Sequence, residues 1–343
     1  MSEPDAVAGV LLVGITFYAV FGGADFGAGF WSLFAGRGER AERRRQLVDW
    51  AIGPVWEANH VWLIFVLVVL WTAFSVAFGS LFSTLFIPLT LAALGIVLRG
   101  AGFAFHRLAP GPRERSVARA LFGIASFPTP FFMGTVVGAV ASERVPIGNA
   151  AGDAVTSWLN PVSLLTGALF VATGIYLAAV FLVSDSRRAG DPELERDFSR
   201  RAIGAGLVAG ALALVGIFVF RADARYVFDG LVGEALPLVI LSAVCGLGAL
   251  VLLHRDARRG ARELAVGAVV SVIWAWGVAQ FPYLLPQVLT IEKAAGAQNT
   301  LTEVLVVFAV AVLLVLPSLA FLYTLSQRGM LEEEDEAPPP TGA

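Results

Sequence analysis

The sequence has 343 residues, of which 57% are hydrophobic and 15% are charged, and its formal net charge is −3 at pH 7. Because no water-soluble domain of ordinary composition is this apolar, we predict an all-α integral membrane protein. Its expected surroundings are a lipid bilayer, and no nucleic-acid partner is expected. The single cysteine excludes a disulfide framework and a cysteine metal cluster.

Nine apolar stretches are long enough to cross about 30 Å of hydrocarbon. They show no two-residue alternation, which favours helices over the strands of a barrel. The first stretch follows neither a basic segment nor a cleavage site, so we expect it to be retained. The predicted spans are 7–34, 52–74, 81–105, 117–141, 158–183, 202–220, 232–253, 264–283 and 301–325. They form one transmembrane domain, 1–327, followed by an acidic, proline-rich tail, 328–343, that is expected to be disordered and cytoplasmic.

The basic residues indicate how the chain is oriented. Most of the 24 lysines and arginines follow the odd-numbered spans. The connection after the first span holds Arg37, Arg40, Arg43, Arg44 and Arg45, and the opposite side holds only Arg144, Arg221, Arg225 and Lys293. Because cytoplasmic loops are enriched in lysine and arginine, the N-terminus is predicted outside and the C-terminus in the cytoplasm.

Three charged residues fall inside the first three spans. At 1.5 Å of rise per residue, Asp25 lies about 13 Å, Glu57 about 8 Å and Arg99 about 10 Å from the cytoplasmic end of its span. We call these three residues the buried polar layer. A charge inside a bilayer is costly and is usually paired or functional. We therefore expect Arg99 to compensate one carboxylate and to leave the other free to titrate.

The layer has a structural and a functional interpretation. It could be an ion pair that holds three helices in register, or it could be part of a proton path. His60 lies one helical turn after Glu57 and could relay protons, or it could be a packed, hydrogen-bonded group. His106 and His254 lie at cytoplasmic helix ends beside arginines, which favours an interfacial role over haem ligation.

Two further patterns concern packing and repetition. The segment "GGADFGAG" contains Gly23 and Gly27 at a spacing that lets another backbone approach closely. The fifth span, "GALFVATGIYLAAVFLVSD", loosely echoes the first, because both place a tyrosine ahead of small residues and an aspartate.

Six segments together resemble subunit II of cytochrome bd-type quinol oxidases over almost the whole chain. In chain order they are "GGADFGAG", "GPVWEANHVWL", "LRGAGFAFH", "FFMGTVVGAV", "FPYLLP" and "LPSLAFLYT". The chain departs from the family pattern at Glu57-Ala58-Asn59, where an acid-glycine-asparagine core is usual. It departs again at Gly22-Gly23-Ala24, where an aspartate-glycine pair is common. These departures mark a divergent member of the family.

The resemblance implies two four-helix bundles plus one peripheral helix, in a multi-pass subunit of a prokaryotic cell membrane. The haem b and haem d-type groups would belong to a homologous subunit I, with none bound by this chain alone. A heterodimer is implied, and a small single-helix subunit is allowed. The complex would oxidise quinol and reduce dioxygen to water electrogenically, with cytoplasmic protons. Asp25, Glu57 and Arg99 match buried polar positions of the family, and Trp62 matches a tryptophan near the oxygen route.

Two other functions fit parts of the sequence. A proton-coupled secondary transporter could use the same buried Asp, Glu and Arg, although no pair of interrupted helices and no inverted repeat is evident. A scaffold without enzymatic activity would explain the packing glycines but not the layered charges.

Overall fold

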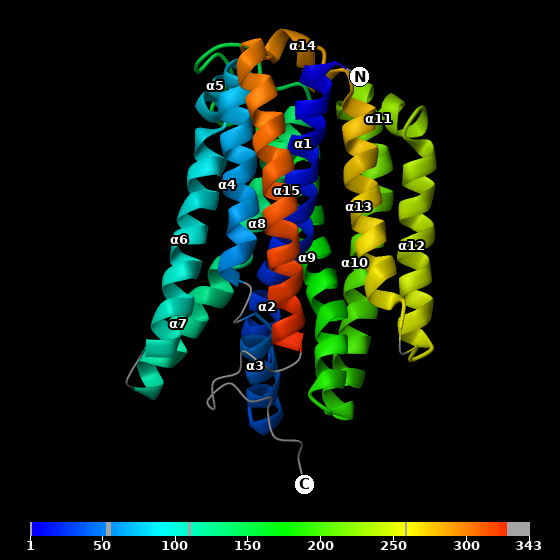
Figure 1. The fold of residues 1–343 in the computed structure, drawn as a ribbon. Helices are drawn as coiled ribbons and strands as arrows, with labels where there is room; N and C mark the ends of the chain where they lie inside the picture. The colour runs from blue at the N-terminus through cyan, green and yellow to red at the C-terminus, as the bar shows by residue number, and fades with distance from the viewer. Residues whose placement is uncertain (1, 53–55, 109–110, 258, 328–343) are drawn as a thin grey trace.

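The computed structural model describes residues 2–52, 56–108, 111–257 and 259–327 of a chain that is almost entirely helical (Figure 1). The start of α1 and the end of α15 lie at opposite ends of the molecule. The helices are α1 (Glu3–Phe17), the π-helix η1 (Tyr18–Gly22), α2 (Gly23–Leu33), α3 (Glu39–Ile52), α4 (Trp56–Ala73), α5 (Ser75–Thr84), α6 (Phe86–Leu108), α7 (Pro112–Ala125), α8 (Pro128–Ala141), α9 (Pro161–Arg188), α10 (Pro192–Asp223), α11 (Arg225–Val232), α12 (Leu236–His254), α13 (Ala261–Gln280), α14 (Ile291–Ala294) and α15 (Gln298–Gln327).

The described residues contain eight helices that are long and apolar enough to cross a membrane. The number rises to nine if α4 and α5, which meet at an angle of 118°, are counted as one broken span. The prediction of a helical protein with many spans is therefore confirmed. The bundle division and the orientation of the termini stay predictions, and the 328–343 tail lies outside the described residues.

Several predicted boundaries differ from the observed ones for identifiable reasons. The span predicted at 117–141 lies within one candidate span, Arg113–Ala141, which begins a few residues earlier. Inside it α7 meets α8 at Pro128, a first-turn position where the missing N–H of proline costs nothing. The span predicted at 264–283 ends at Gln280, because Phe281 precedes Pro282 and is extended. The chain continues there as a short antiparallel pair, β1 (Tyr283–Leu285) and β2 (Leu289–Thr290).

Helix α9 lies at the centre of the molecule, where it packs against α2, α8 and α10. Glycine makes two of these contacts possible. A Cβ atom on Gly27 would lie 2.0 Å from the carbonyl oxygen of Gly174, and one on Gly138 would lie 2.4 Å from the Cα of Ser163. The predicted close backbone approach at the "GGADFGAG" segment is thus confirmed.

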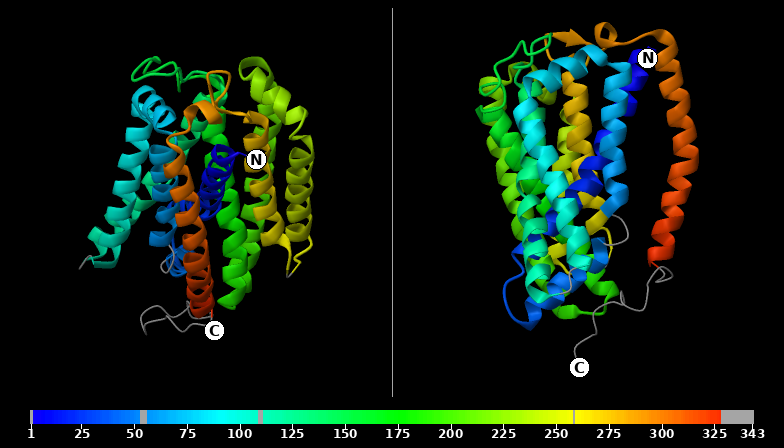
Figure 2. Two further views of the ribbon diagram at one scale, coloured as in Figure 1. Left: turned by 45° about the horizontal axis from the view of Figure 1, so that its top comes forward. Right: turned by 90° about the vertical axis from the view of Figure 1, so that its left-hand side faces the viewer.

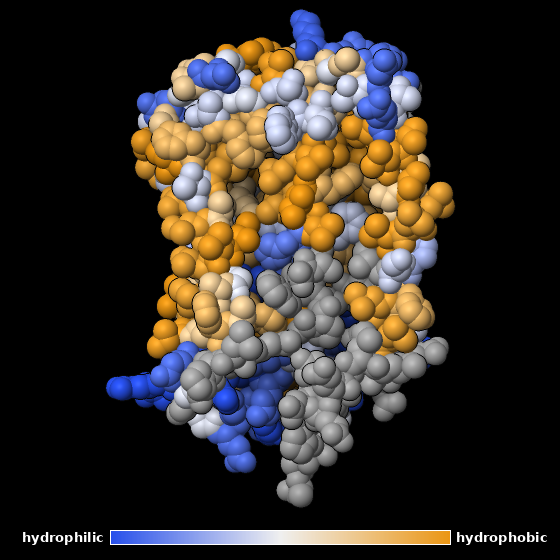
Figure 3. All heavy atoms as spheres, turned by 60° about the vertical axis from the view of Figure 1, so that its left-hand side comes forward, coloured by the Kyte–Doolittle hydropathy of each residue, from blue (hydrophilic) through white to orange (hydrophobic). Residues whose placement is uncertain are grey.

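Helix α15 lies at the edge of the molecule and packs mainly against α1 and α4 (Figures 1 and 2). Apolar side chains cover the middle of the face in Figure 3, and hydrophilic residues gather toward both ends. Exposed side chains such as Phe218 of α10, Leu247 of α12 and Leu313 of α15 extend the apolar surface around the bundle. This distribution is what a lipid-facing surface requires.

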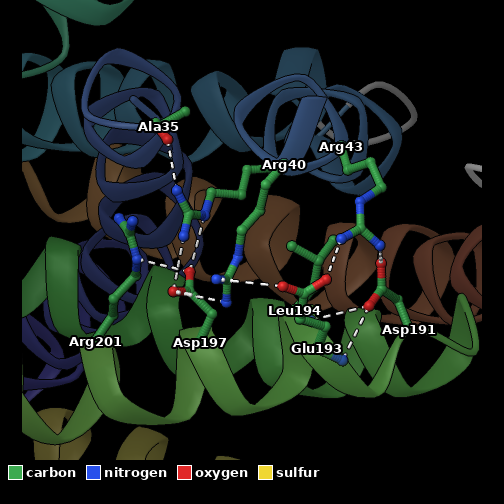
Figure 4. Close-up of polar contacts among 9 residues, drawn as sticks. Ala35, Arg40, Arg43, Asp191, Glu193, Leu194, Asp197 and Arg201 are labelled. Carbon is green, nitrogen blue, oxygen red and sulfur yellow. Dashed lines mark hydrogen bonds and ion pairs between the residues drawn. The ribbon is translucent and has the colours of Figure 1, made fainter. Parts of the chain in front are cut away.

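The arginine-rich segments 37–45 and 187–201, which include α3 and the adjoining ends of α9 and α10, lie at one end of the molecule (Figure 1). We call them the arginine-rich loops. There α3 is joined to the start of α10 by ion pairs (Figure 4). Arg43 contacts Asp191 at 2.7 Å, and Arg44 contacts Asp197 at 2.8 Å. We call this group, with Arg40 and Glu193, the surface ion-pair cluster.

Candidate functional site: a buried aspartate–arginine pair

Asp25 of α2 and Arg99 of α6 form a two-pronged ion pair inside the helix bundle. The Arg99 Nη1 donates to one carboxylate oxygen of Asp25 at 2.8 Å, and Nη2 donates to the other at 2.6 Å. Nη2 also lies 3.1 Å from the Asp25 carbonyl oxygen. The Arg99 side chain is 1% exposed and that of Asp25 is 3% exposed. Among the described residues, Asp25 is therefore a carboxylate that Arg99 compensates.

The remaining surface of the Arg99 guanidinium is also enclosed. Its Nε donates to the Ser126 hydroxyl at 3.0 Å, and that hydroxyl donates to the Phe122 carbonyl. The guanidinium carbon lies 4.8 Å from the centre of the Phe26 ring and 4.6 Å from that of Phe122. Both distances are within the range of a cation–π interaction. The arginine is thus held by a fork of hydrogen bonds and two aromatic rings, which fixes its orientation.

The helix that carries Asp25 is distorted just before it. The π-helix η1 inserts an extra residue at Tyr18–Gly22, and such turns often occur at functional sites. Gly22 makes room for the Tyr18 ring, because a Cβ on Gly22 would lie 2.9 Å from that ring. Within the described part of the chain, the buried Tyr18 hydroxyl has no hydrogen-bond partner.

His60 of α4 lies beside this distortion. Its ring is 6.5 Å from that of Tyr18 and 6.4 Å from that of Phe26, with an edge-to-face orientation in both cases. The structure therefore brings His60 next to the Asp25–Arg99 pair through two aromatic side chains. The side chain of Glu57, one turn earlier on α4, lies outside the described residues, so its predicted place in the layer stays a prediction.

Trp62 belongs to an apolar cluster farther along α4. Its ring stacks on Phe17 at 4.3 Å and meets Phe65 edge-to-face at 6.4 Å. Phe65 in turn lies 5.8 Å from Phe308 of α15. The tryptophan therefore lies in an aromatic path between α1, α4 and α15.

Comparisons with known proteins identify the family of this chain. A family model described as cytochrome bd terminal oxidase subunit II matches residues 4–326. The chain belongs to this family. The earlier expectation of a bd-type subunit II, drawn from the six segments, is confirmed.

The relatives of this subunit II are named as parts of quinol oxidases. This chain is 26% identical over 373 residues to the cytochrome bd-I ubiquinol oxidase subunit 2 of Escherichia coli strain K12. The alignment covers 96% of this chain and 94% of the relative. The chain is 23% identical over 339 residues to a putative cytochrome bd menaquinol oxidase subunit II of Bacillus subtilis strain 168, covering 94% and 96%. The bd oxidase structure from Geobacillus thermodenitrificans matches with a TM-score of 0.77 and 26% identity, over 95% of this chain and 98% of that one.

No metal site is evident in the part of subunit II that the structure describes. No group of three or more His, Cys, Asp or Glu residues there could hold a metal ion. His254 is exposed at the end of α12, and the His106 side chain lies outside the described residues. The family is that of a subunit of a haem-containing oxidase.

Sequence reasoning missed several residues of this site. Nothing in the sequence indicated that Ser126, which ends α7 and lies 27 residues after Arg99, would contact that arginine. Phe26 and Phe122 are two of 25 phenylalanines and gave no separate signal. The π-helix at Tyr18 was equally hidden, because its residues fit an ordinary apolar helix.

Proposed function

We propose that this chain is the non-haem subunit of a bd-type quinol oxidase and that its buried polar layer carries cytoplasmic protons toward a haem-bearing subunit I. The observation that supports the proposal most is the Asp25–Arg99 pair. A carboxylate and an arginine are buried together between two apolar helices. Well-packed apolar side chains would serve packing equally well, so a retained buried pair indicates a further role.

The pair also divides the work between the two carboxylates of the layer. Both oxygens of Asp25 accept hydrogen bonds from Arg99. Asp25 is therefore held in a two-pronged ion pair. Glu57 is the second carboxylate of the layer and, by helix rise, lies nearer the cytoplasmic end of its span than Asp25 does. We therefore assign the proton-carrying role to Glu57, with His60 as the neighbouring relay.

The oxygen route is a second part of the proposal. Dioxygen is apolar and small, so it moves through loosely packed apolar side chains more readily than through polar ones. The cluster of Phe17, Trp62 and Phe65 is apolar and reaches Phe308 of α15, so we place the oxygen route there. The family match over residues 4–326 supports an oxidase subunit over the transporter alternative.

The decisive experiment uses the assembled oxidase with Glu57→Gln and, as a matched control at the opposite end of the molecule, Glu292→Gln. We expect Glu57→Gln to assemble with normal haem content and to lose quinol-driven oxygen consumption, while the control respires normally. If Glu57→Gln and Asp25→Asn both respire like the wild type at every accessible pH, the layer is structural. Expressed alone, the chain should bind no stoichiometric haem. A haem spectrum abolished by changing His60 would contradict the proposed division between the subunits.

A further inference from the structure

A cavity of about 110 Å³ lies below the Asp25–Arg99 pair, toward the end of the molecule that carries the arginine-rich loops. It is bounded by α2, α3, α9 and α13, with Asn59 contributed by α4. Small side chains, among them Ala28, Ala51 and Ala178, leave the space open. A cavity needs roughly 10 to 15 Å³ of this kind of volume, and polar partners, to hold one water. This one has room for several waters.

The cavity has a carboxylate at each end. Asp25 lines it on the side of the polar layer, and Asp185 lines it at the last turn of α9. Asn59, which is buried and two residues after Glu57, lies on its wall. The waters would therefore have hydrogen-bonding groups along the whole length of the space.

Asp185 connects the cavity to the surface of the molecule. The aspartate is 6% exposed and forms an ion pair with Arg188, one turn later on the same helix. The Arg188 side chain is 40% exposed and lies 5.7 Å from the ring of Trp50 on α3. Arg262 of α13, which stacks on Phe181 at 4.2 Å, is the other cation on the cavity wall. The charged groups that face Asp185 are thus Arg188 and Arg262, with Asp25 at the far end.

We propose that this cavity is the entrance by which protons reach the buried polar layer, and that Asp185 takes them up at its mouth. Asp185 accepts a proton from water on the arginine-rich side and becomes neutral, which loosens its ion pair with Arg188. It then passes a proton through the cavity waters to the layer and returns to the carboxylate. Both arginines stay protonated throughout.

The position of Asp185 also relates to the weak similarity between the first and the fifth predicted spans. The fifth span repeats the order of tyrosine, small residues and aspartate found in the first, and the two aspartates are Asp185 and Asp25. In the folded chain both line the same cavity. The inference rests on the proposed function, because the entrance has a purpose only if the layer carries protons.

The test uses the assembled oxidase in proteoliposomes with Asp185→Asn, Asp185→Glu and Glu195→Gln. The last is the matched control, since Glu195 pairs with Arg187 at the same end of α9 but does not line the cavity. We expect the Asp185→Asn complex to keep its haem and to consume oxygen about tenfold more slowly. This loss is smaller than the roughly 100-fold that a positioned proton-transfer group contributes, because water still enters the cavity. The loss should grow as pH rises. Asp185→Glu should restore most of the rate, and Glu195→Gln should match the wild type.

If Asp185→Asn keeps the wild-type rate and pH profile while Glu57→Gln is inactive, the entrance is wrong and the proposed function stands. If Glu57→Gln and Asp25→Asn are also unaffected, both fail. Should Asp185→Asn not assemble, Ala51→Cys in a Cys245→Ser background offers a second route. A membrane-impermeant methanethiosulfonate added on the arginine-rich side should then block oxygen consumption. An unchanged rate after complete labelling overturns the entrance, and the Cys245→Ser complex without the new cysteine is the control.

Discussion

The molecule uses arginine–carboxylate pairs in two places that differ chiefly in their access to solvent. In the surface ion-pair cluster, the side chains of Arg40 and Glu193 are 46% and 51% exposed. In the buried polar layer, those of Arg99 and Asp25 are 1% and 3% exposed. The surface cluster joins α3 to α10, whereas the buried pair joins α2 to α6.

The difference in exposure changes what each pair is worth. Water and salt screen the exposed Arg40–Glu193 pair, so it contributes about 0 to 1 kcal/mol. A fully buried pair gains little over apolar packing, but removal of one partner leaves an uncompensated charge that costs about 3 to 5 kcal/mol. Loss of one charged side chain should therefore cost little stability at the surface and much more inside the bundle.

The largest effect should come from Arg99→Leu, which leaves Asp25 buried without its partner. We expect the assembled complex to lose about 3 to 5 kcal/mol of stability, measured as loss of haem-containing complex on heating. The control is the double variant Asp25→Leu with Arg99→Leu, which removes both charges and should recover most of that loss. A single variant as stable as the wild type would mean that Asp25 does not need its counter-charge.

The next effect tests whether backbone contact, and not charge, holds α2 against α9. Gly27→Ala places a methyl group 2.0 Å from the Gly174 carbonyl oxygen, and overpacking of this kind costs about 1 to 3 kcal/mol. Gly204→Ala on α10 is the matched control, because no atom lies within 4 Å of its added Cβ. It should be neutral or stabilising by up to about 1 kcal/mol. Equal behaviour of the two variants in thermal melting would remove the argument for a close approach.

The smallest effect should come from the surface ion-pair cluster. Arg40→Ala removes contacts of 3.2 and 3.6 Å to Glu193 and Asp197, and we expect a loss below about 1 kcal/mol. Because exposed charges are screened, the loss should shrink further at high salt. Melting curves at low and high ionic strength would measure it. A loss as large as that of Arg99→Leu would erase the distinction between the two regions.

The sequence predicted that Arg99 compensates one of two buried carboxylates, but it did not indicate which one or what surrounds the pair. Depth along each span placed Asp25 and Arg99 in one layer, since helix rise is constant and the loops indicate direction. The contact of Ser126 with Arg99 and the place of Asp185 in the same cavity as Asp25 were not predicted, because both depend on how the helices rotate and pack. The 118° bend between α4 and α5 was missed as well, since Phe74, where it occurs, is neither proline nor glycine. Periodicity and charge counts hold no information on such tertiary features.

The most direct test of the central claim measures where the protons for oxygen reduction come from. Oxidase is reconstituted in proteoliposomes of known orientation, and the pH on each side is recorded during a burst of quinol-driven oxygen consumption. The account predicts that the wild type removes protons from the side that holds the arginine-rich loops. It predicts that Glu57→Gln stops this uptake while its haems remain in place. Proton uptake from the opposite side, or unchanged uptake in Glu57→Gln, would contradict it.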